Sequence, residues 1–404
     1  ADAGRSVCGL ASMAVSKRRS LTPKSPGRTL AQKYRISMRH ILGQGGFGTV
    51  YEGLDITRDT EVAIKVFAGT DNSLATFYSS IHIWTNIQLH SSTNKCQQFG
   101  RTVSCNNLLV IDELKKSLAS DDELRLNQLV THLDIRRCFA EIVEYSRDED
   151  GEPGRDPESG LLFIVYEKGG TSLEKELEAR HSGAEQQMDG QELLDLLWSL
   201  VCLTWGLHVC GYVHMDIKPA NIIKFPSQPG ENGGVRWKLI DLDGAVCTNE
   251  TIALKDCCVT HVFMPPEIAK CMAEDRATAV TSRKMDVWSV AMCVMQAIFS
   301  VPILEPWYKQ WQGETGDDTK FLKWLGDYTA EPIICGDMEQ HICDIDPRLG
   351  ALLKFMLSKD PESRPCIARC MTDLAFRKHR ARLLEADKGL LEVIAEVHAD
   401  RGIG

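Results

Sequence analysis

The chain has 404 residues, of which 43% are hydrophobic and 25% are charged, a composition that is ordinary for a globular protein with a large core and two lobes or domains. No run approaches the roughly 18 consecutive apolar residues that a membrane-spanning helix needs, so we predict no membrane span. The 15 cysteines are irregularly spaced and form no CxxC pair, which favours reduced thiols over disulfides or a zinc site.

The amino-terminal part of the chain is basic. Residues 1–40 contain nine Lys or Arg and one acidic residue, whereas the whole chain has a net charge of −10. We predict a disordered, solvated basic tail over residues 1–33, with a nuclear-import signal or an anion-binding patch as the alternative. The expected location is therefore the cytoplasm, with the nucleus as the alternative.

Three strands are predicted next, over 34–38, 49–51 and 61–67. The turn between the first two reads Gly43-Gln44-Gly45-Gly46-Phe47-Gly48-Thr49-Val50, which fits G-x-G-x-x-G-x-V. Glycines let a backbone approach phosphate groups, and their amides then point at the anion. This turn joins two strands and opens no helix, which disfavours a dinucleotide-binding fingerprint.

Lys65 lies inside the third predicted strand, flanked by Ala63, Ile64, Val66 and Phe67. An ammonium group in such apolar surroundings needs a charged partner. The following residues, 69–110, are rich in Ser, Thr, Asn and Gln, and we interpret them as an insertion with some helix. Residues 111–132 have helical spacing.

A strand that is apolar throughout is predicted over 161–166, after a charged Gly/Pro-rich loop at 147–160. The rest of the chain is predicted to be mostly helical. A helix around 193–203 is too apolar for a surface helix. Further helical patterns cover 284–299, 319–325, 348–357, 363–376 and 381–397.

The most informative segment is His214-Met215-Asp216-Ile217-Lys218-Pro219-Ala220-Asn221. It places a carboxylate, an ammonium and an amide close together, as phosphoryl transfer requires for orienting a hydroxyl, neutralising phosphate and holding a metal. A hairpin loop at 226–234 then leads to a strand over 237–240, which ends directly before Asp241.

The order of these motifs resembles that in the eukaryotic protein kinase family. Having a lysine at position 218 resembles the Ser/Thr-specific kinases more than the tyrosine kinases. The resemblance continues in Met264-Pro265-Pro266-Glu267, in Asp286-Val287-Trp288-Ser289 and in Asp360-Pro361-Glu362-Ser363-Arg364-Pro365. It covers about residues 34–376 and implies that Arg364 pairs with Glu267. The implied fold is α+β and bilobal: a small antiparallel-sheet lobe over 34–168, a large mainly helical lobe over 169–376, and a helical extension over 377–404.

The resemblance also implies roles for individual residues. Lys65 is expected to bind the α- and β-phosphates of ATP, Asp216 to orient the substrate hydroxyl and Lys218 to neutralise the transferring phosphoryl group. Asn221 and Asp241 are expected to bind Mg²⁺. The implied ATP site comprises Gly43, Gln44, Gly45, Gly46, Phe47, Gly48, Val50, Ala63, Lys65, Tyr166, Glu167, Lys168, Asn221 and Asp241.

Two features depart from the family pattern, and one expected ion pair has two candidate partners. Met215 stands where an arginine usually precedes the catalytic aspartate, so we predict activity that does not need phosphorylation of the activation segment. Asp241-Leu242-Asp243 replaces Asp-Phe-Gly, and a shifted alignment that uses Asp243 as the metal ligand is the alternative. The glutamate expected to pair with Lys65 is Glu123, with Glu113 as the alternative.

These observations predict a monomeric kinase that transfers the ATP γ-phosphate to Ser/Thr hydroxyls of protein substrates with Mg²⁺ and without a nucleic-acid partner. One alternative is a pseudokinase that acts as a nucleotide-binding or interaction scaffold. A second alternative, a small-molecule phosphotransferase, is disfavoured by the Pro265-Pro266-Glu267 segment together with Arg364.

Overall fold

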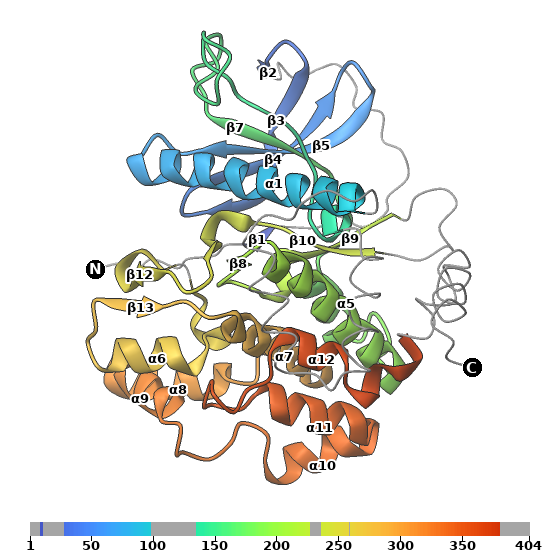
Figure 1. Ribbon diagram of the computed structural model, residues 1–404, viewed down its shortest axis with the longest axis vertical. Coiled ribbons are helices and arrows are strands. Elements are labelled where there is room, and N and C mark those ends of the chain that lie inside the picture. Colours follow the sequence, from blue (N-terminus) through green and yellow to red (C-terminus); the bar gives the residue numbers. More distant parts are fainter. Residues whose placement is uncertain (1–8, 11–27, 98–134, 227–235, 258, 380–404) are drawn as a thin grey trace. The chain divides into compact units, whose positions relative to one another are not determined.

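The computed structural model describes residues 9–10, 28–97, 135–226, 236–257 and 259–379. The chain divides into two compact units (Figure 1). The sheet unit contains residues 1–91, 135–187 and 214–246, and the helical unit contains 92–134, 188–213 and 247–404. The basic tail, the carboxy-terminal extension and both candidate glutamates, Glu113 and Glu123, lie mainly or wholly outside the described residues. The lobe boundaries given above stay predictions.

A seven-stranded antiparallel sheet forms the first part of the sheet unit. Six strands follow the order β1-β3-β4-β5-β7-β6. The seventh, β2, also pairs with β3 and lies outside this linear order. The strands are β1 (Gly9–Leu10), β2 (Arg28–Leu30), β3 (Tyr34–Gly45), β4 (Gly48–Asp55), β5 (Thr60–Phe67), β6 (Ile142–Tyr145) and β7 (Phe163–Glu167). The predicted strands over 34–38, 49–51, 61–67 and 161–166 are therefore confirmed.

The glycine-rich turn is the tight end of the β3–β4 hairpin, where Gly45 pairs with Gly48. A side chain at Gly48 has no room, because a Cβ there would lie 2.3 Å from the carbonyl oxygen of Val66 on β5. At Gly46 a Cβ would meet nothing within 4 Å. The hairpin thus approaches the lysine-bearing strand closely at Gly48, while the Gly46 end of the turn faces open space.

The two faces of β5 bury different neighbours, since side chains alternate along a strand. Val62 and Ile64 belong to a core cluster with Phe163 and Val165 of β7. Phe67 belongs to a second cluster on the opposite face, and Lys65 shares that face because it is two residues away. Lys65 therefore lies on the face of the sheet that α1 covers.

Helix α1 (Asp71–Gln97) begins four residues after β5 and packs across the sheet (Figure 1). Phe77 and Ile81 are buried against the sheet, with Leu74 and Trp84 beside them. These positions follow the three- and four-residue spacing of a helix face. The helix expected within 69–110 is present as α1, and the interpretation of 69–110 as an insertion stays a prediction. The intervening Ser, Thr and Asn residues hide the apolar stripe of α1 in the sequence.

The remaining elements of the sheet unit are short. They are η1 (Ile135–Cys138), α4 (Leu173–His181), η2 (Pro219–Asn221), β9 (Ile222–Phe225), β10 (Arg236–Leu239) and η3 (Leu242–Gly244). β9 and β10 pair antiparallel, with Ile222 opposite Leu239. This hairpin brings the end of the Asp216–Asn221 segment beside the strand that leads to Asp241.

The helical unit is built around α5 (Gly190–Val209) and α7 (Arg283–Phe299). A capping box of Asp189 and Glu192 starts α5. By length and composition alone α5 could cross a membrane, but 78% of its most apolar window is buried inside the protein. Buried core helices of water-soluble proteins pass the same test, so this is weak evidence for a membrane span among the described helices.

The other elements of this unit agree with the mostly helical prediction. They are β8 (Tyr212–Val213), β11 (Val246–Cys247, which begins at the unit boundary), β12 (Thr251–Ala253), η4 (Leu254–Asp256), η5 (His261–Phe263), α6 (Pro266–Ala273), β13 (Thr278–Val280), α8 (Glu305–Thr315), α9 (Thr319–Gly326), α10 (Gly336–Ile345), α11 (Pro347–Met356), α12 (Ile367–Met371) and η6 (Leu374–Phe376). The single helix predicted over 363–376 is instead two short pieces. Every cysteine whose side chain is described is free.

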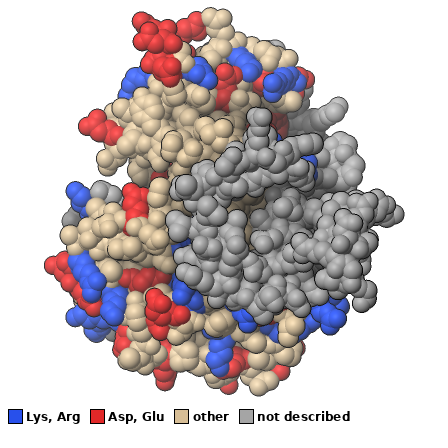
Figure 2. Space-filling model, in the orientation of Figure 1, with Lys and Arg blue, Asp and Glu red and all other residues tan. Residues whose placement is uncertain are grey.

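Charged side chains of both signs are spread over the face seen in Figure 2. Acidic side chains gather at the tip of the sheet unit, where Figure 1 places the loop between β6 and β7. Glu149, Asp150 and Glu152 of this loop are exposed. The charged loop predicted at 147–160 is confirmed as a solvated connection between two strands.

Candidate active site

Lys65 contacts two carboxylates that come from one short segment after β10. Its Nζ lies 2.9 Å from Oδ1 of Asp241 and also contacts Oδ2 of Asp243. The side chains of Lys65, Asp241 and Asp243 are only 10%, 14% and 6% exposed. On the other side, Asp243 accepts a hydrogen bond of 3.1 Å from Oγ of Ser80 on α1. A strand, a helix and a loop thus meet at one buried ionic cluster.

The three charges change one another's pKa values. Burial opposes the charged form of Lys65, but the two carboxylates raise its pKa well above the ordinary value. Burial would also raise the pKa of Asp241, yet the neighbouring Lys65 ammonium lowers it. Burial and the charge of Asp241 raise the pKa of Asp243. One ammonium therefore fully stabilises only one of the two carboxylates.

Asp216, Lys218 and Asn221 lie together at the predicted catalytic loop. Nζ of Lys218 lies 2.7 Å from Oδ2 of Asp216. The amide nitrogen of Asn221 donates a 2.9 Å hydrogen bond to the backbone oxygen of Asp216. Because its nitrogen is used in this way, the amide oxygen of Asn221 is the atom that can face a cation.

His214 links this loop to the end of β10, a contact that sequence reasoning missed. Its Nδ1 accepts a 3.3 Å hydrogen bond from the backbone amide of Asp216, so its Nε2 donates to the backbone oxygen of Ile240 at 3.2 Å. Ile240 directly precedes Asp241. Its backbone amide also donates to the backbone oxygen of Asn221 at 2.9 Å. The Asp216 loop and the residue before Asp241 are thus fixed to each other by the His214 side chain and by one main-chain hydrogen bond.

Two residues of the site have left-handed backbone conformations that only glycine adopts without cost. Met215 has φ of 69° and Asp241 has φ of 63°. Such conformations persist only where the surrounding structure enforces them, and they concentrate at functional sites. Met215 directly precedes Asp216, so the predicted catalytic carboxylate has a constrained backbone beside it and the predicted metal-binding carboxylate has one at its own position.

The residues predicted to surround adenine lie at the end of β7. Tyr166 is opposite Ala63 of β5 in the sheet, and burial raises its pKa. Glu167 accepts a hydrogen bond from the backbone amide of Glu141 and pairs with Lys238. These contacts hold the strand end in place.

Lys168 is also engaged. It pairs with Glu52 on β4 and with Glu61 on β5, at 3.0 Å in the second case. Glu167 and Lys168 are therefore tied to neighbouring residues. The backbone amide of Glu167 is engaged as well, because it donates to the backbone oxygen of Glu141 at 3.0 Å.

The helical unit contains the ion pair that the resemblance implied. Arg364 binds Glu267 through two parallel hydrogen bonds of 2.8 and 2.9 Å, and its side chain is fully buried. The other donors of Arg364 reach three backbone oxygens, those of Lys284, Ser358 and Lys359. This guanidinium is satisfied on every side, which is typical of a structural ion pair.

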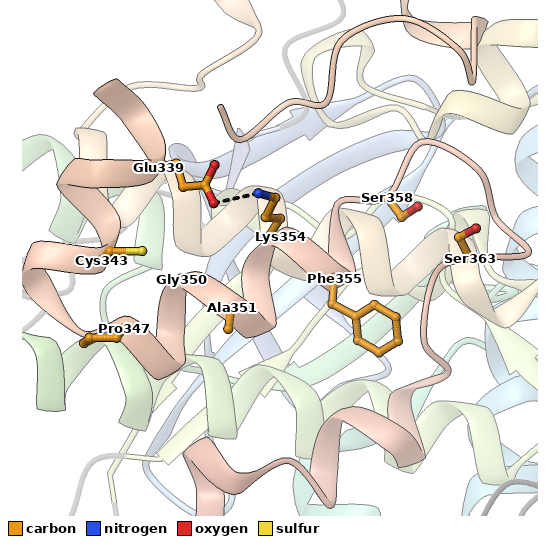
Figure 3. A pocket seen from close by; sticks show the side chains of 9 residues that line it. All are labelled: Glu339, Cys343, Pro347, Gly350, Ala351, Lys354, Phe355, Ser358 and Ser363. Atoms are coloured by element: carbon orange, nitrogen blue, oxygen red, sulfur yellow. Dashed lines mark hydrogen bonds and ion pairs between the residues drawn. The ribbon is translucent and has the colours of Figure 1, made fainter. Parts of the chain in front are cut away.

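A groove of about 550 Å³ lies in the helical unit between α10 and α11 (Figure 3). Glu339 and Lys354 close one side of it with a 2.6 Å ion pair, and Cys343 and Phe355 also line it (Figure 3). None of the residues predicted to bind ATP or Mg²⁺ lines this groove. It is therefore separate from the predicted chemistry.

Comparison with known proteins gives matches to protein kinases. The family model described as "Protein kinase domain" matches residues 155–376, which is more than half of the chain. Calcium-dependent protein kinase 27 of Arabidopsis thaliana is 23% identical over 67% of this chain and 49% of its own length. Serine/threonine-protein kinase 16 of Mus musculus is 26% identical over 62% of this chain and 74% of its own length. The chain thus spans from about half to about three quarters of these two relatives.

Proposed function

The chain belongs to the protein kinase family, and we propose that it is an active serine/threonine kinase that transfers the γ-phosphate of ATP to protein hydroxyl groups with Mg²⁺. Its fold is the one that the sequence predicted, with a small antiparallel-sheet region and a large mainly helical region. The proposal extends from membership of the family to catalytic activity, the metal and the acceptor residue.

One observation carries the proposal: a single compact unit gathers five groups that phosphoryl transfer needs from three distant segments. Lys65 comes from β5, Asp216, Lys218 and Asn221 from the loop that ends in η2, and Asp241 from the end of β10. Hydrogen bonds from the backbone of Ile240 to Asn221 and to the His214 side chain hold the last two segments together.

The oxygen ligands fit Mg²⁺. This ion usually takes one or two protein carboxylate or carbonyl ligands, and substrate phosphates and water supply the rest. Asp241 and the amide oxygen of Asn221 would supply the protein ligands. In the described part of the chain no group of three or more His, Cys, Asp or Glu side chains could hold a metal by itself. Bound with ATP, Mg²⁺ would neutralise negative charge on the phosphates.

The other residues would position the reactants. Lys65 would bind the α- and β-phosphates, while the glycine-rich turn would place its backbone amides over them. Asp216 would accept the proton of the substrate hydroxyl. At the same time the hydroxyl oxygen would bond to the γ-phosphorus, and the bond between this phosphorus and ADP would break. Lys218, 2.7 Å from Asp216, would orient this carboxylate and neutralise charge on the transferring group.

A nucleotide-binding scaffold without transfer activity is the second candidate. Two observations favour it. Asp243 stands where the family has glycine, and α1 contains no glutamate that could pair with Lys65. Lys65, Asp216 and Asp241 are all present, however, so the residues whose loss usually marks a pseudokinase remain.

The proposal is tested by incubating the purified chain with ATP, Mg²⁺ and generic basic and acidic protein substrates. Phosphate transfer to serine or threonine is expected, and Asp216→Asn serves as the inactive control. Mg²⁺-dependent ATP binding without transfer to any substrate would support the scaffold instead.

A further inference from the structure

The partner of Lys65 is unusual in this chain. The only acidic residue of α1 is Asp71, in its first turn. The residue of α1 that faces the ionic cluster is Ser80, which is 2% exposed. Asp71 lies nine residues before Ser80, or roughly 14 Å along the helix axis. Helix α1 therefore supplies no carboxylate to Lys65. It supplies the hydroxyl group of Ser80, which binds Asp243, and Asp243 in turn contacts Lys65.

Asp243 has the geometry of a residue that orients Lys65. One of its carboxylate oxygens contacts Nζ of Lys65, and the other accepts the hydrogen bond from Ser80. It lies in η3, directly after the constrained backbone of Asp241. The carboxylate is thus fixed from both sides, by a strand lysine and by a helix hydroxyl.

The second carboxylate of the cluster has a different task in the proposed function. If Asp241 binds Mg²⁺, its charge is shared with the metal and it cannot hold Lys65 as it does here. A buried ammonium without a carboxylate is costly, and its direction is not fixed. Among the residues that the structure describes, Asp243 would then be the acid that remains beside Lys65.

We propose that Asp243, oriented by Ser80, is the positioning residue that directs Lys65 toward the phosphates of ATP. This inference rests on the proposed function, because it assigns Asp241 to the metal. It gives Asp243 a role beside the metal site rather than in it. It also explains how Lys65 can be oriented by a helix that has no suitably placed acid.

The first test is Asp243→Asn, which keeps the shape and the hydrogen bond to Ser80 but removes the charge. A misplaced phosphate-binding group costs on the order of 10²-fold in rate. We expect kcat/KM for ATP to fall by about tenfold to a hundredfold, while nucleotide binding still depends on Mg²⁺. The matched control is Asp71→Asn, which makes the same chemical change at the acidic residue of α1. It is expected to behave like the unmodified chain.

The second test moves the carboxylate. Asp243→Gly is expected to lose activity, and Ser80→Glu in the Asp243→Gly background is expected to recover at least a tenth of the unmodified kcat/KM, because the acid then comes from α1. Melting temperatures of all variants show whether each is folded. The recovery separates positioning from a purely structural role.

Several results would overturn the proposal. They are unchanged kcat and KM in Asp243→Asn, nucleotide binding in that variant that no longer depends on Mg²⁺, or no recovery in a folded double variant. Nucleotide affinity is measured alongside turnover, so the two proposals can fail separately. An unmodified chain that binds ATP but transfers nothing refutes the proposed activity, and weaker ATP binding in Asp243→Asn would still support the role of Asp243.

Discussion

The two units each bury an ionic cluster, and the clusters differ in the ratio of acids to bases. In the helical unit one guanidinium meets one carboxylate, and backbone oxygens use its remaining donors. In the sheet unit one ammonium meets two carboxylates, so one acid is left incompletely stabilised. The charges of the first cluster balance without a ligand, whereas the second cluster has one more carboxylate than ammonium groups and can therefore bind a cation. The ratio of charges thus separates a structural ion pair from a candidate site.

This difference predicts that changes in the two clusters affect different properties. Lys65→Met and Asp216→Asn are each expected to abolish phosphate transfer, because one removes phosphate binding and the other removes the group that orients the hydroxyl. Loss of a positioned general base typically costs about 10²–10⁴ in rate. Transfer assays with matched protein concentrations measure the effect.

The melting temperature of Asp216→Asn should stay near that of the unmodified chain, and Asp344→Asn, on the exposed side of α10, serves as the control for the same chemical change. Near-normal turnover in Asp216→Asn would falsify the assignment of the catalytic residue.

The opposite pattern is expected in the helical unit. Arg364→Met leaves Glu267 buried without its partner, and such a change typically costs about 3–5 kcal/mol of stability. Chemical denaturation measures the free energy of unfolding. Arg348→Met is the control, since Arg348 is 51% exposed in its ion pair with Asp346 and its loss should change the free energy of unfolding far less. Equal losses in both variants would contradict the structural role given to Arg364.

Within the sheet-unit cluster, the two carboxylates should differ. Asp241→Ala is expected to remove Mg²⁺-dependent nucleotide binding, because Asp241 lies two residues after β10 and the backbone of Ile240 before it is fixed by hydrogen bonds. Asp243→Ala should weaken this dependence less. Titration of ATP with and without Mg²⁺ measures both. A larger effect at Asp243 would favour the shifted alignment, in which Asp243 is the metal ligand.

The smallest expected effect concerns phosphorylation. Met215 cannot bind a phosphate, so the segment from Asp241 to Glu267 lacks the arginine through which phosphorylation often acts. Phosphatase treatment, and the double change Thr248→Ala with Thr251→Ala, should leave activity within about tenfold, or roughly 1.4 kcal/mol of barrier. A greater loss of activity in either sample would refute this prediction, because it would mean that a phosphorylated residue is needed for activity.

The helix after β5 shows where the sequence was insufficient. Leu74, Phe77 and Ile81 follow helical spacing, yet the polar residues between them led to the interpretation as an insertion. Helices α4, α6, α8 and α10 were not predicted individually. Few of their side chains are buried, for example only Ile342 in α10, so their apolar patterns are weak. The strands around the glycine-rich turn were predicted correctly, since alternation and turn residues are local signals.

By itself the sequence determined the candidate groups of the site, because the glycine-rich turn, Lys65, the Asp216–Asn221 loop and Asp241 each occur in a short, recognisable segment. Only the tertiary structure decided which acids face Lys65. Asp241 lies 176 residues from it in the chain, and no local pattern encodes that distance. Burying an ammonium is favourable only where folding brings a carboxylate within hydrogen-bonding distance. In this chain that carboxylate comes from the η3 segment, held by Ser80, and not from an acid on α1.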